Sequence, residues 1–117
     1  MIVFQSTQDK VLAALQSVAG IVERRHTLPV LANVLIRKTA GQVQLTTSDL
    51  EIQIRTHADL GGDDTSFATT VGARKLIDIL RTLPADQVVS LESQQSKLVL
   101  KGGKSKFTLQ TLPAEDF

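Results

Sequence analysis

The amino-acid sequence predicts an α+β domain in which one β-α-β-β-β unit occurs twice. The chain has 117 residues, of which 42% are hydrophobic, and this length and apolar content suit one domain with a sizeable core. Apolar residues recur at spacings of three and four in two segments, which is typical of amphipathic helices. Short runs of alternating apolar and polar residues follow each segment, as expected of half-buried strands.

The first unit begins with a short strand at residues 2–6 and continues into a helix over residues 8–22. Thr7 offers an N-cap hydroxyl, and Asp9 lies in the first turn, where a negative charge is favourable. The helical spacing is carried by Val11, Leu12, Leu15, Val18, Ala19 and Val22. Residues 24–29 form a connector, because Pro29 does not continue a helix.

Three strands complete the first unit. The first covers Leu31 to Arg37, the second contains Val43 and Leu45, and the third contains Leu50, Ile52 and Ile54. Turn residues separate them at 40–41 and 47–49, and a polar loop with two glycines follows at 60–64.

The second half of the chain repeats this order. We expect a strand at 67–71, a helix over Ala73 to Leu83 closed by Pro84, and strands at 88–91, 98–100 and 107–109. Gly102 and Gly103 predict a hairpin turn before the last strand.

The two halves also match position by position. Adding 65 to the residue numbers of the first helix superimposes Val11, Leu12, Leu15 and Val18 on Leu76, Ile77, Leu80 and Leu83. Adding 55 superimposes Val43, Leu45, Ile52, Ile54 and Thr56 on Leu98, Leu100, Phe107, Leu109 and Thr111. One unit is too short to bury its own sheet face and helix stripe, so two units should close around a shared core, with the helices side by side and sheet behind them. Chance similarity of short amphipathic elements is the alternative, because the matched positions are merely apolar.

Composition excludes several classes of function. The chain has no cysteine, so disulfides and thiolate metal sites are excluded, and we expect a cytoplasmic protein. It shows no secretory signal and no apolar run long enough to span a membrane. The net charge is only +1, and four Phe are the only aromatic residues, so base stacking on single strands is not expected. Any contact with DNA should be local and directed at phosphates.

The sequence gives little support to an enzyme, a cofactor site or a metal site. Gly103-Lys104-Ser105 resembles the end of a phosphate-binding loop, but Leu98 stands where that motif needs a glycine, and a strand rather than a helix follows. His26 and His57 have no metal-ligand partner at helical spacing. The carboxylate pairs Asp63-Asp64 and Asp49/Glu51 lie in predicted turns, where solvation is the simpler interpretation.

Four segments carry a resemblance to a known family. They are Arg25-His26-Thr27-Leu28-Pro29-Val30-Leu31, Thr47-Ser48-Asp49-Leu50-Glu51, Val71-Gly72-Ala73-Arg74-Lys75 and Phe107-Thr108-Leu109-Gln110-Thr111-Leu112-Pro113. Their order and spacing resemble the amino-terminal domain of the bacterial DNA sliding clamp, the beta subunit of DNA polymerase III. The chain departs from the family at Gly72, where many members have proline, and we expect a less rigid start of the second helix there.

This resemblance implies a DNA-clamp fold and a non-catalytic processivity factor without cofactors. Residues 1–117 would form the first of three domains, with internal repeats at about 1–60 and 66–117, and the acidic, turn-like end 112–117 suits a domain taken from a longer chain. Two subunits would close head to tail into a homodimeric ring around duplex DNA. The DNA polymerase III alpha subunit and the clamp loader would bind later domains.

The basic residues of the helices are the candidates for DNA contact. Lys10, Ala13, Ser17 and Gly20 share a face of the first helix, Arg24 and Arg25 follow it, and Arg74, Asp78 and Arg81 recur on the second helix. The resemblance places these surfaces toward the pore and matches Arg25 and Arg74 to positions near the phosphate backbone. The alternative is a solvated helix face on which Arg74, Asp78 and Arg81 pair their charges along the helix. For Lys10 and Arg81 this alternative and DNA contact have equal weight.

The carboxyl-terminal hairpin is a candidate docking edge. It carries Lys97, Lys101, Lys104 and Lys106, with no acidic residue between Gln94 and Leu112. Lysines also protect sheet edges, which is the alternative interpretation. The resemblance implies that the last strand pairs with the other subunit, where Phe107 and Leu109 supply apolar contact and Lys75, Lys104 and Lys106 face acidic residues. A stand-alone β-rich module that binds a partner by strand addition is the alternative function.

Overall fold

The computed structural model describes residues 2–22, 29–39, 42–49, 51–61, 66–94 and 97–117. The first unit consists of β1 (Ile2–Thr7), α1 (Gln8–Val18), the 3-10 helices η1 (Ala19–Ile21) and η2 (Pro29–Ala32), β2 (Asn33–Thr39), β3 (Gln42–Ser48) and β4 (Gln53–Ala58). The second unit consists of β5 (Phe67–Gly72), α2 (Ala73–Leu80), β6 (Val88–Gln94), β7 (Lys97–Gly102) and β8 (Ser105–Leu112), followed by η3 (Ala114–Asp116). The predicted α+β class with two β-α-β-β-β units is confirmed.

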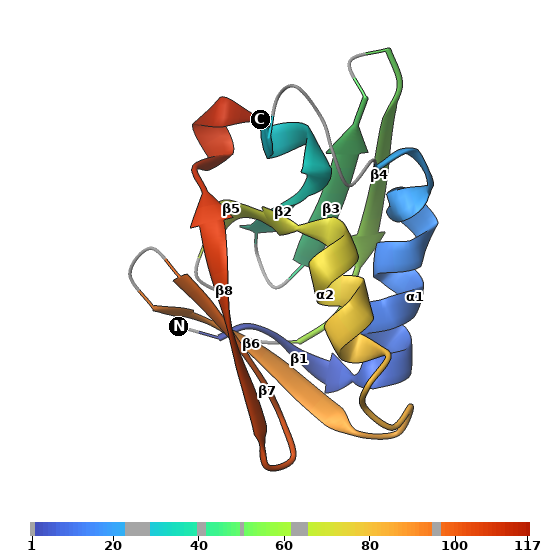
Figure 1. The fold of residues 1–117 in the computed structure, drawn as a ribbon, viewed down its shortest axis with the longest axis vertical. Coiled ribbons are helices and arrows are strands. Elements are labelled where there is room, and N and C mark those ends of the chain that lie inside the picture. Colours follow the sequence, from blue (N-terminus) through green and yellow to red (C-terminus); the bar gives the residue numbers. More distant parts are fainter. Residues whose placement is uncertain (1, 23–28, 40–41, 50, 62–65, 95–96) are drawn as a thin grey trace.

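The two units exchange their first strands. The eight antiparallel strands follow the order β1-β6-β7-β8-β5-β2-β3-β4. Strand β1 pairs with β6 of the second unit, with Phe4 opposite Leu91, and β5 pairs with β2 of the first unit, with Thr70 opposite Leu35. Each half of the sheet therefore contains three strands of one unit and one strand of the other. Among the described residues, the two halves join only between β5 and β8 (Figure 1).

The two helices lie side by side and run in opposite directions, as their end contacts show (Figure 1). The buried side chain of Gln8, at the start of α1, donates from Nε2 to the carbonyl of Leu80, the last residue of α2, at 2.7 Å. At the other end Arg74, near the start of α2, donates from Nη2 to the carbonyl of Ala19, just beyond α1, at 3.3 Å. Each helix thus caps the carboxyl end of the other, where carbonyl groups lack partners within their own helix.

The core lies between the helix pair and the sheet. Val11, Leu15 and Val18 of α1 and Leu76 and Leu80 of α2 are each at most 2% exposed. They pack with apolar residues of all the strands into one cluster that spans both units. Burial of a shared core explains why the apolar positions of the two units recur at matching intervals.

A buried lysine ties the first strand to the rest of the sheet. Lys38 of β2 is 0% exposed, and its Nζ donates to the carbonyls of Val3 at 2.7 Å and Gly61 at 3.0 Å, with Ile2 at 3.4 Å. The register of β1 on β6 shifts between Ile2 and Phe4, so Val3 has no residue opposite it on β6. The Lys38 ammonium supplies a hydrogen bond to Val3 at this irregularity.

The first helix is shorter than predicted. It ends at Val18 rather than residue 22 and tightens into η1. The carbonyl of Val18 accepts a hydrogen bond from the Thr47 hydroxyl, and the Val22 N–H turns to the Ala19 carbonyl at 3.0 Å. The prediction that Thr7 caps the helix with its hydroxyl is wrong, because that hydroxyl donates to the Asp9 carboxylate instead.

The second helix also ends early, at Leu80 rather than Leu83. The N–H groups of Thr82 and Leu83 donate to carbonyls three residues back, Ile79 and Leu80, at 3.0 and 3.1 Å. This tighter turn precedes Pro84 and leaves Leu83 half-buried beside the core.

Two strands begin later than predicted. Strand β2 begins at Asn33 rather than Leu31, because Pro29–Ala32 forms a 3-10 turn. Strand β4 begins at Gln53, and Ile52 lies outside it with 54% of its surface exposed. The Asp49 carboxylate accepts hydrogen bonds from the N–H groups of Glu51 and Ile52 and holds a turn there. Leu50 lies outside the described residues.

Candidate nucleic-acid face and docking edge

The solvent face of α1 is open and carries small side chains. Lys10, Ala13, Ser17 and Gly20 are all exposed, as the helical spacing predicts. A Cβ atom built on Gly20 would meet nothing within 4 Å, and the Ser17 hydroxyl turns back to the Ala14 carbonyl at 2.7 Å. A large polyanion could therefore approach the backbone of α1 closely over about two turns, with Lys10 at one end.

Arg74 makes structural hydrogen bonds at the other end of this face. Its side chain is half-buried, and Nη2 donates to the carbonyls of Ala19 at 3.3 Å and Val22 at 3.2 Å. A guanidinium has five N–H donors, so these contacts leave others for a further ligand. Arg24 and Arg25 lie outside the described residues, which stop at Val22 before them.

The described basic residues of the helix pair fall at its two ends. Because the helices are antiparallel, exposed Lys10 and exposed Arg81 lie near one end, and Arg74 lies near the other. Asp9 is exposed beside Lys10, and the hydrogen bond from Thr7 lowers the pKa of the Asp9 carboxyl below its ordinary value. The face thus carries scattered charges of both signs, with the small side chains between them.

Strand β8 presents an edge that is only partly used. On one side it pairs with β7 from Ser105 to Gln110. On the other side it meets β5 only at Thr70–Leu112 and Val71–Thr111. Among the described residues, the stretch 105–110 has no strand partner on that second side. An unpaired row of backbone donors and acceptors is suited to accept another strand.

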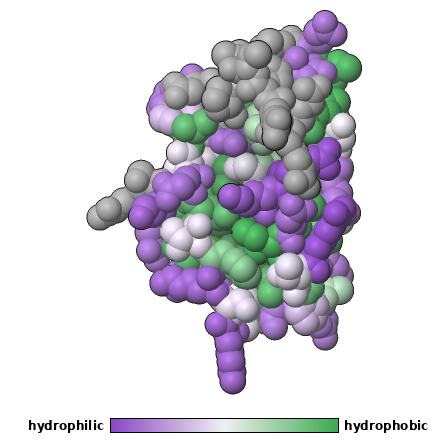
Figure 2. All heavy atoms as spheres, viewed as in Figure 1, coloured by the Kyte–Doolittle hydropathy of each residue, from purple (hydrophilic) through white to green (hydrophobic). Residues whose placement is uncertain are grey.

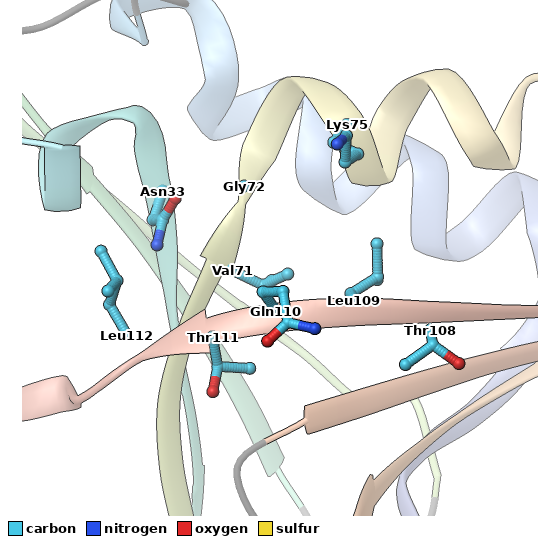
Figure 3. A pocket seen from close by; sticks show the side chains of 9 residues that line it. All are labelled: Asn33, Val71, Gly72, Lys75, Thr108, Leu109, Gln110, Thr111 and Leu112. Carbon is cyan, nitrogen blue, oxygen red and sulfur yellow. The ribbon is translucent and has the colours of Figure 1, made fainter.

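A hollow of about 410 Å³ lies where β8 diverges from β5 (Figure 3). Its walls come from β2, β5, the start of α2 and the last half of β8: Asn33, Val71, Gly72, Lys75, Thr108, Leu109, Gln110, Thr111 and Leu112. Figure 2 shows hydrophobic residues near the centre of the face seen in that view, with hydrophilic residues around them. The hollow thus lies beside the open edge of β8, and its lining includes the apolar Val71 and Leu109 and the ammonium group of Lys75.

The hollow brings together two of the five residues predicted for docking, Lys75 and Leu109. Leu109 is only 3% exposed and belongs to the core. It can therefore offer a partner the backbone groups of the strand edge, but not a free side chain. Phe107 packs partly buried against the core. Lys104, at the hairpin turn, and Lys106 are exposed but do not line this hollow.

Leu112, which is 37% exposed in the hollow, is not among the residues predicted for docking. Neither is Asn33, which lies on a strand distant in sequence. Neither residue carries a pattern that indicates docking: one is an apolar residue beside a proline and the other a single amide. Only the divergence of β8 from β5 brings them together.

The lysines of the β7–β8 hairpin are partly neutralised. Lys101 lies opposite Lys106 in the register, an unfavourable pairing of like charges. The Glu92 carboxylate of β6 makes an ion pair with Lys101 at 2.8 Å, and this contact lowers the pKa of the Glu92 carboxyl below its ordinary value. Lys97 and Lys106 line a second hollow together with Gln94, Val99 and Thr108.

The residues weighed for catalysis or metal binding have other roles where they are described. Gly103, with φ of 59°, and Lys104 form the two-residue turn of the β7–β8 hairpin, and β8 follows as a strand. The exposed His57 ring lies 3.2 Å from the Gln44 amide nitrogen, and Asp49 holds a turn. His26, Asp63 and Asp64 lie outside the described residues. The described residues contain no cluster of three metal-ligating side chains, and none of their helices is long and apolar enough to cross a membrane.

Comparison with known proteins gives consistent similarities. Residues 2–117 match the family model of the DNA polymerase III beta subunit, N-terminal domain. The chain is 45% identical over 114 residues to the beta sliding clamp of Pseudomonas putida, covering 97% of this chain and 31% of the relative. The crystal structure of the sliding clamp from Pseudomonas aeruginosa superimposes with a TM-score of 0.92 at 45% identity, over 97% of this chain and 31% of that one. The sliding clamp from Caulobacter crescentus gives a TM-score of 0.90 at 33% identity, with the same two coverages.

Proposed function

Because the chain belongs to the family of the DNA polymerase III beta subunit, N-terminal domain, we propose that it is one domain of a sliding clamp. A clamp is a non-catalytic ring that encircles duplex DNA and tethers the replicative polymerase to it. The chain spans 31% of the length of its Pseudomonas relatives, so residues 1–117 would be the first of three domains. The observation that carries the proposal is the pair of adjacent helices with small, open side chains on one face and a sheet behind them.

In this proposal the helix face lines the pore. Lys10 and Arg81 attract phosphates at one end, and Arg74, Arg24 and Arg25 attract them at the other. Small side chains between the two ends let the duplex pass without reading its bases. A clamp that slides needs attraction to the phosphate backbone without sequence-specific contacts, and sparse cationic side chains provide it. A net charge of +1 suits such weak contact, because the ring itself retains the DNA.

The open edge of β8 would hold the second subunit of a head-to-tail homodimer. A strand of the partner would add along residues 105–110 and continue the sheet across the interface. Lys75 stands at the mouth of the hollow, where an acidic partner side chain would pair with it. Phe107 and Leu109 would supply the apolar support, and Lys104 and Lys106 would attract acidic residues at the rim. The DNA polymerase III alpha subunit and the clamp loader would bind later domains.

The test uses the full-length protein that contains this chain, loaded on a nicked circular DNA by a bacterial clamp loader. The bound protein is measured before and after the circle is cut once with a restriction enzyme. We expect the protein to leave the DNA after linearisation, since only a topological link is broken. A matched circle that lacks the restriction site should retain it.

Two results would contradict the proposal. Retention on linear DNA would indicate ordinary surface binding. Failure to load, together with a reading frame that has no further domains, would favour the alternative of a stand-alone module that binds by strand addition, for which the open β8 edge is also suited.

A further inference from the structure

A buried hydrogen-bond relay stands where β8 diverges from β5. Thr70 of β5 is 0% exposed, and its hydroxyl donates to the carbonyl of Leu112 on β8 at 2.8 Å. The same hydroxyl accepts a hydrogen bond from the Asn33 side-chain amide of β2 at 3.0 Å. Three strands thus meet at one hydroxyl group, which serves as donor and acceptor at once.

This relay lies at a point where the sheet has little other support. Only two residue pairs, Thr70–Leu112 and Val71–Thr111, join β8 to β5, whereas six pairs join β8 to β7. The Thr70 hydroxyl adds a side-chain hydrogen bond at the first of these pairs, Thr70–Leu112. Asn33 and Leu112 also line the hollow, so the relay fixes two of its walls (Figure 3).

The hydrogen bond between Asn33 and Thr70 is buried, and the one from Thr70 to the Leu112 carbonyl is part-buried. Asn33 is 9% exposed, and among the described residues no buried side-chain nitrogen or oxygen lacks a partner. A buried hydrogen bond is strengthened by its apolar surroundings, and its loss leaves polar groups without water to replace it. Removal of the Thr70 hydroxyl would leave the Leu112 carbonyl and the Asn33 amide without this shared partner.

We propose that Thr70 is a positioning residue for the docking edge: its hydroxyl holds the end of β8 at a fixed distance from β5 and thereby sets how firmly the open edge retains a partner strand. The inference rests on the proposed function, because the partner is the second clamp subunit. The inference goes beyond the proposed function because it assigns control of subunit retention to Thr70, a buried residue that does not itself contact the partner. When the relay is broken, Thr111 and Leu112 separate more readily from β5, and residues 105–110 no longer keep one orientation.

The experiment compares three variants of the full-length protein with the wild type. Thr70→Val removes the hydroxyl at nearly constant volume, and Thr70→Ser keeps the hydroxyl. Thr47→Val is the matched control, because Thr47 is also a strand threonine at 0% exposure whose hydroxyl donates to a backbone carbonyl, that of Val18, but it lies away from β8. Two differently labelled preparations of each protein are mixed, and subunit exchange is followed by energy transfer between the labels.

We expect Thr70→Val to exchange subunits about tenfold faster than wild type, equivalent to ~1.4 kcal/mol of lost retention. Thr70→Ser should be close to wild type. Thr47→Val should lower the melting temperature as much as Thr70→Val does without accelerating exchange. Hydrogen exchange in the 117-residue chain gives a second measurement, in which amides of residues 105–112 lose protection in Thr70→Val only.

Equal subunit exchange in Thr70→Val and Thr47→Val, or unchanged protection of residues 105–112, would overturn the inference. A failure of the proposed function is seen separately, in the wild type. If wild-type subunits form no dimer, no energy transfer occurs in any preparation, and both the clamp proposal and the assigned control of retention are wrong.

Discussion

Replacement of the buried Lys38 by methionine should strongly destabilise the fold. Methionine has a similar length and an apolar tip, so Lys38→Met removes the ammonium group with little change in packing. The change takes away the donor to the carbonyls of Val3 and Gly61, at 2.7 and 3.0 Å, and to the more distant carbonyl of Ile2. It therefore weakens the link between β1, β2 and the segment after β4.

The size of the effect follows from these contacts. A hydrogen bond to a charged group contributes ~1.5–3 kcal/mol, and two of the three contacts have good distances. The desolvation cost of the ammonium, which methionine avoids, offsets part of this loss. We expect a net loss of about 3 kcal/mol in the free energy of unfolding. For a domain of this length that corresponds to a fall of roughly 10 °C in melting temperature.

The assay is urea unfolding followed by circular dichroism, because the chain has no Trp and no Tyr for intrinsic fluorescence. Lys97→Met is the control, since Lys97 is an exposed lysine of β7 and its loss should have little effect. If Lys38→Met unfolds within about 1 kcal/mol of Lys97→Met, the carbonyl contacts contribute little and the reasoning is refuted.

Three further predictions concern other parts of the structure. Gly61→Ala should lose ~1–3 kcal/mol in urea unfolding, because Gly61 has φ of 73° and a Cβ there would lie 2.7 Å from the Gln5 carbonyl oxygen; a neutral result would contradict this geometry. In the full-length protein, Arg81→Met should weaken only the salt-dependent attraction to duplex DNA. Arg74→Met should also lower the melting temperature, because Arg74 donates hydrogen bonds to two backbone carbonyls. Equal melting temperatures of the two variants would count against the capping role of Arg74. The lowered pKa of Glu92 predicts a small stabilisation of the folded state. This stabilisation is present above the unfolded-state pKa and is lost as the pH falls through the lower folded-state pKa. NMR titration of the Glu92 carboxyl carbon should show the lower pKa in the wild type.

Much of the fold could be predicted from the sequence because each element has its own periodicity. Helical spacing identified the cores of α1 and α2, and alternation identified the strands, since burial of one face imposes these intervals. The helix ends were less predictable. Val18 ends α1 because a hydroxyl distant in sequence, on Thr47, takes its carbonyl, and no local pattern reports such a contact.

The exchange of first strands between the units was beyond sequence reasoning. Alternation shows which side of a strand is buried, but it does not identify the neighbouring strand. Lys38 is a different case, because it follows Val34 and Ile36 at a spacing of two and so falls on the buried face of its strand. This spacing therefore indicates that Lys38 is buried, in spite of its charge.

The candidate sites were predictable only in part. The basic residues and the lysine-rich hairpin were visible as charge patterns, and the family resemblance gave them roles. The hollow beside β8 depends on the angle at which two strands diverge, so Asn33 and Leu112 could be found only in three dimensions. Arg24 and Arg25 lie outside the described residues, and their role remains a prediction.

The exchanged first strands also determine when this domain can fold during synthesis. Ile2 lies opposite Glu92, so β1 has no neighbouring strand until β6, some 90 residues later in the sequence, has been made. Contacts between residues so distant in sequence slow folding, and an edge that waits without a partner is exposed to aggregation. A nascent chain stopped near residue 60 would hold a helix and several strands but not a complete sheet half. Folding should therefore occur late and in one cooperative step, after β6 has emerged.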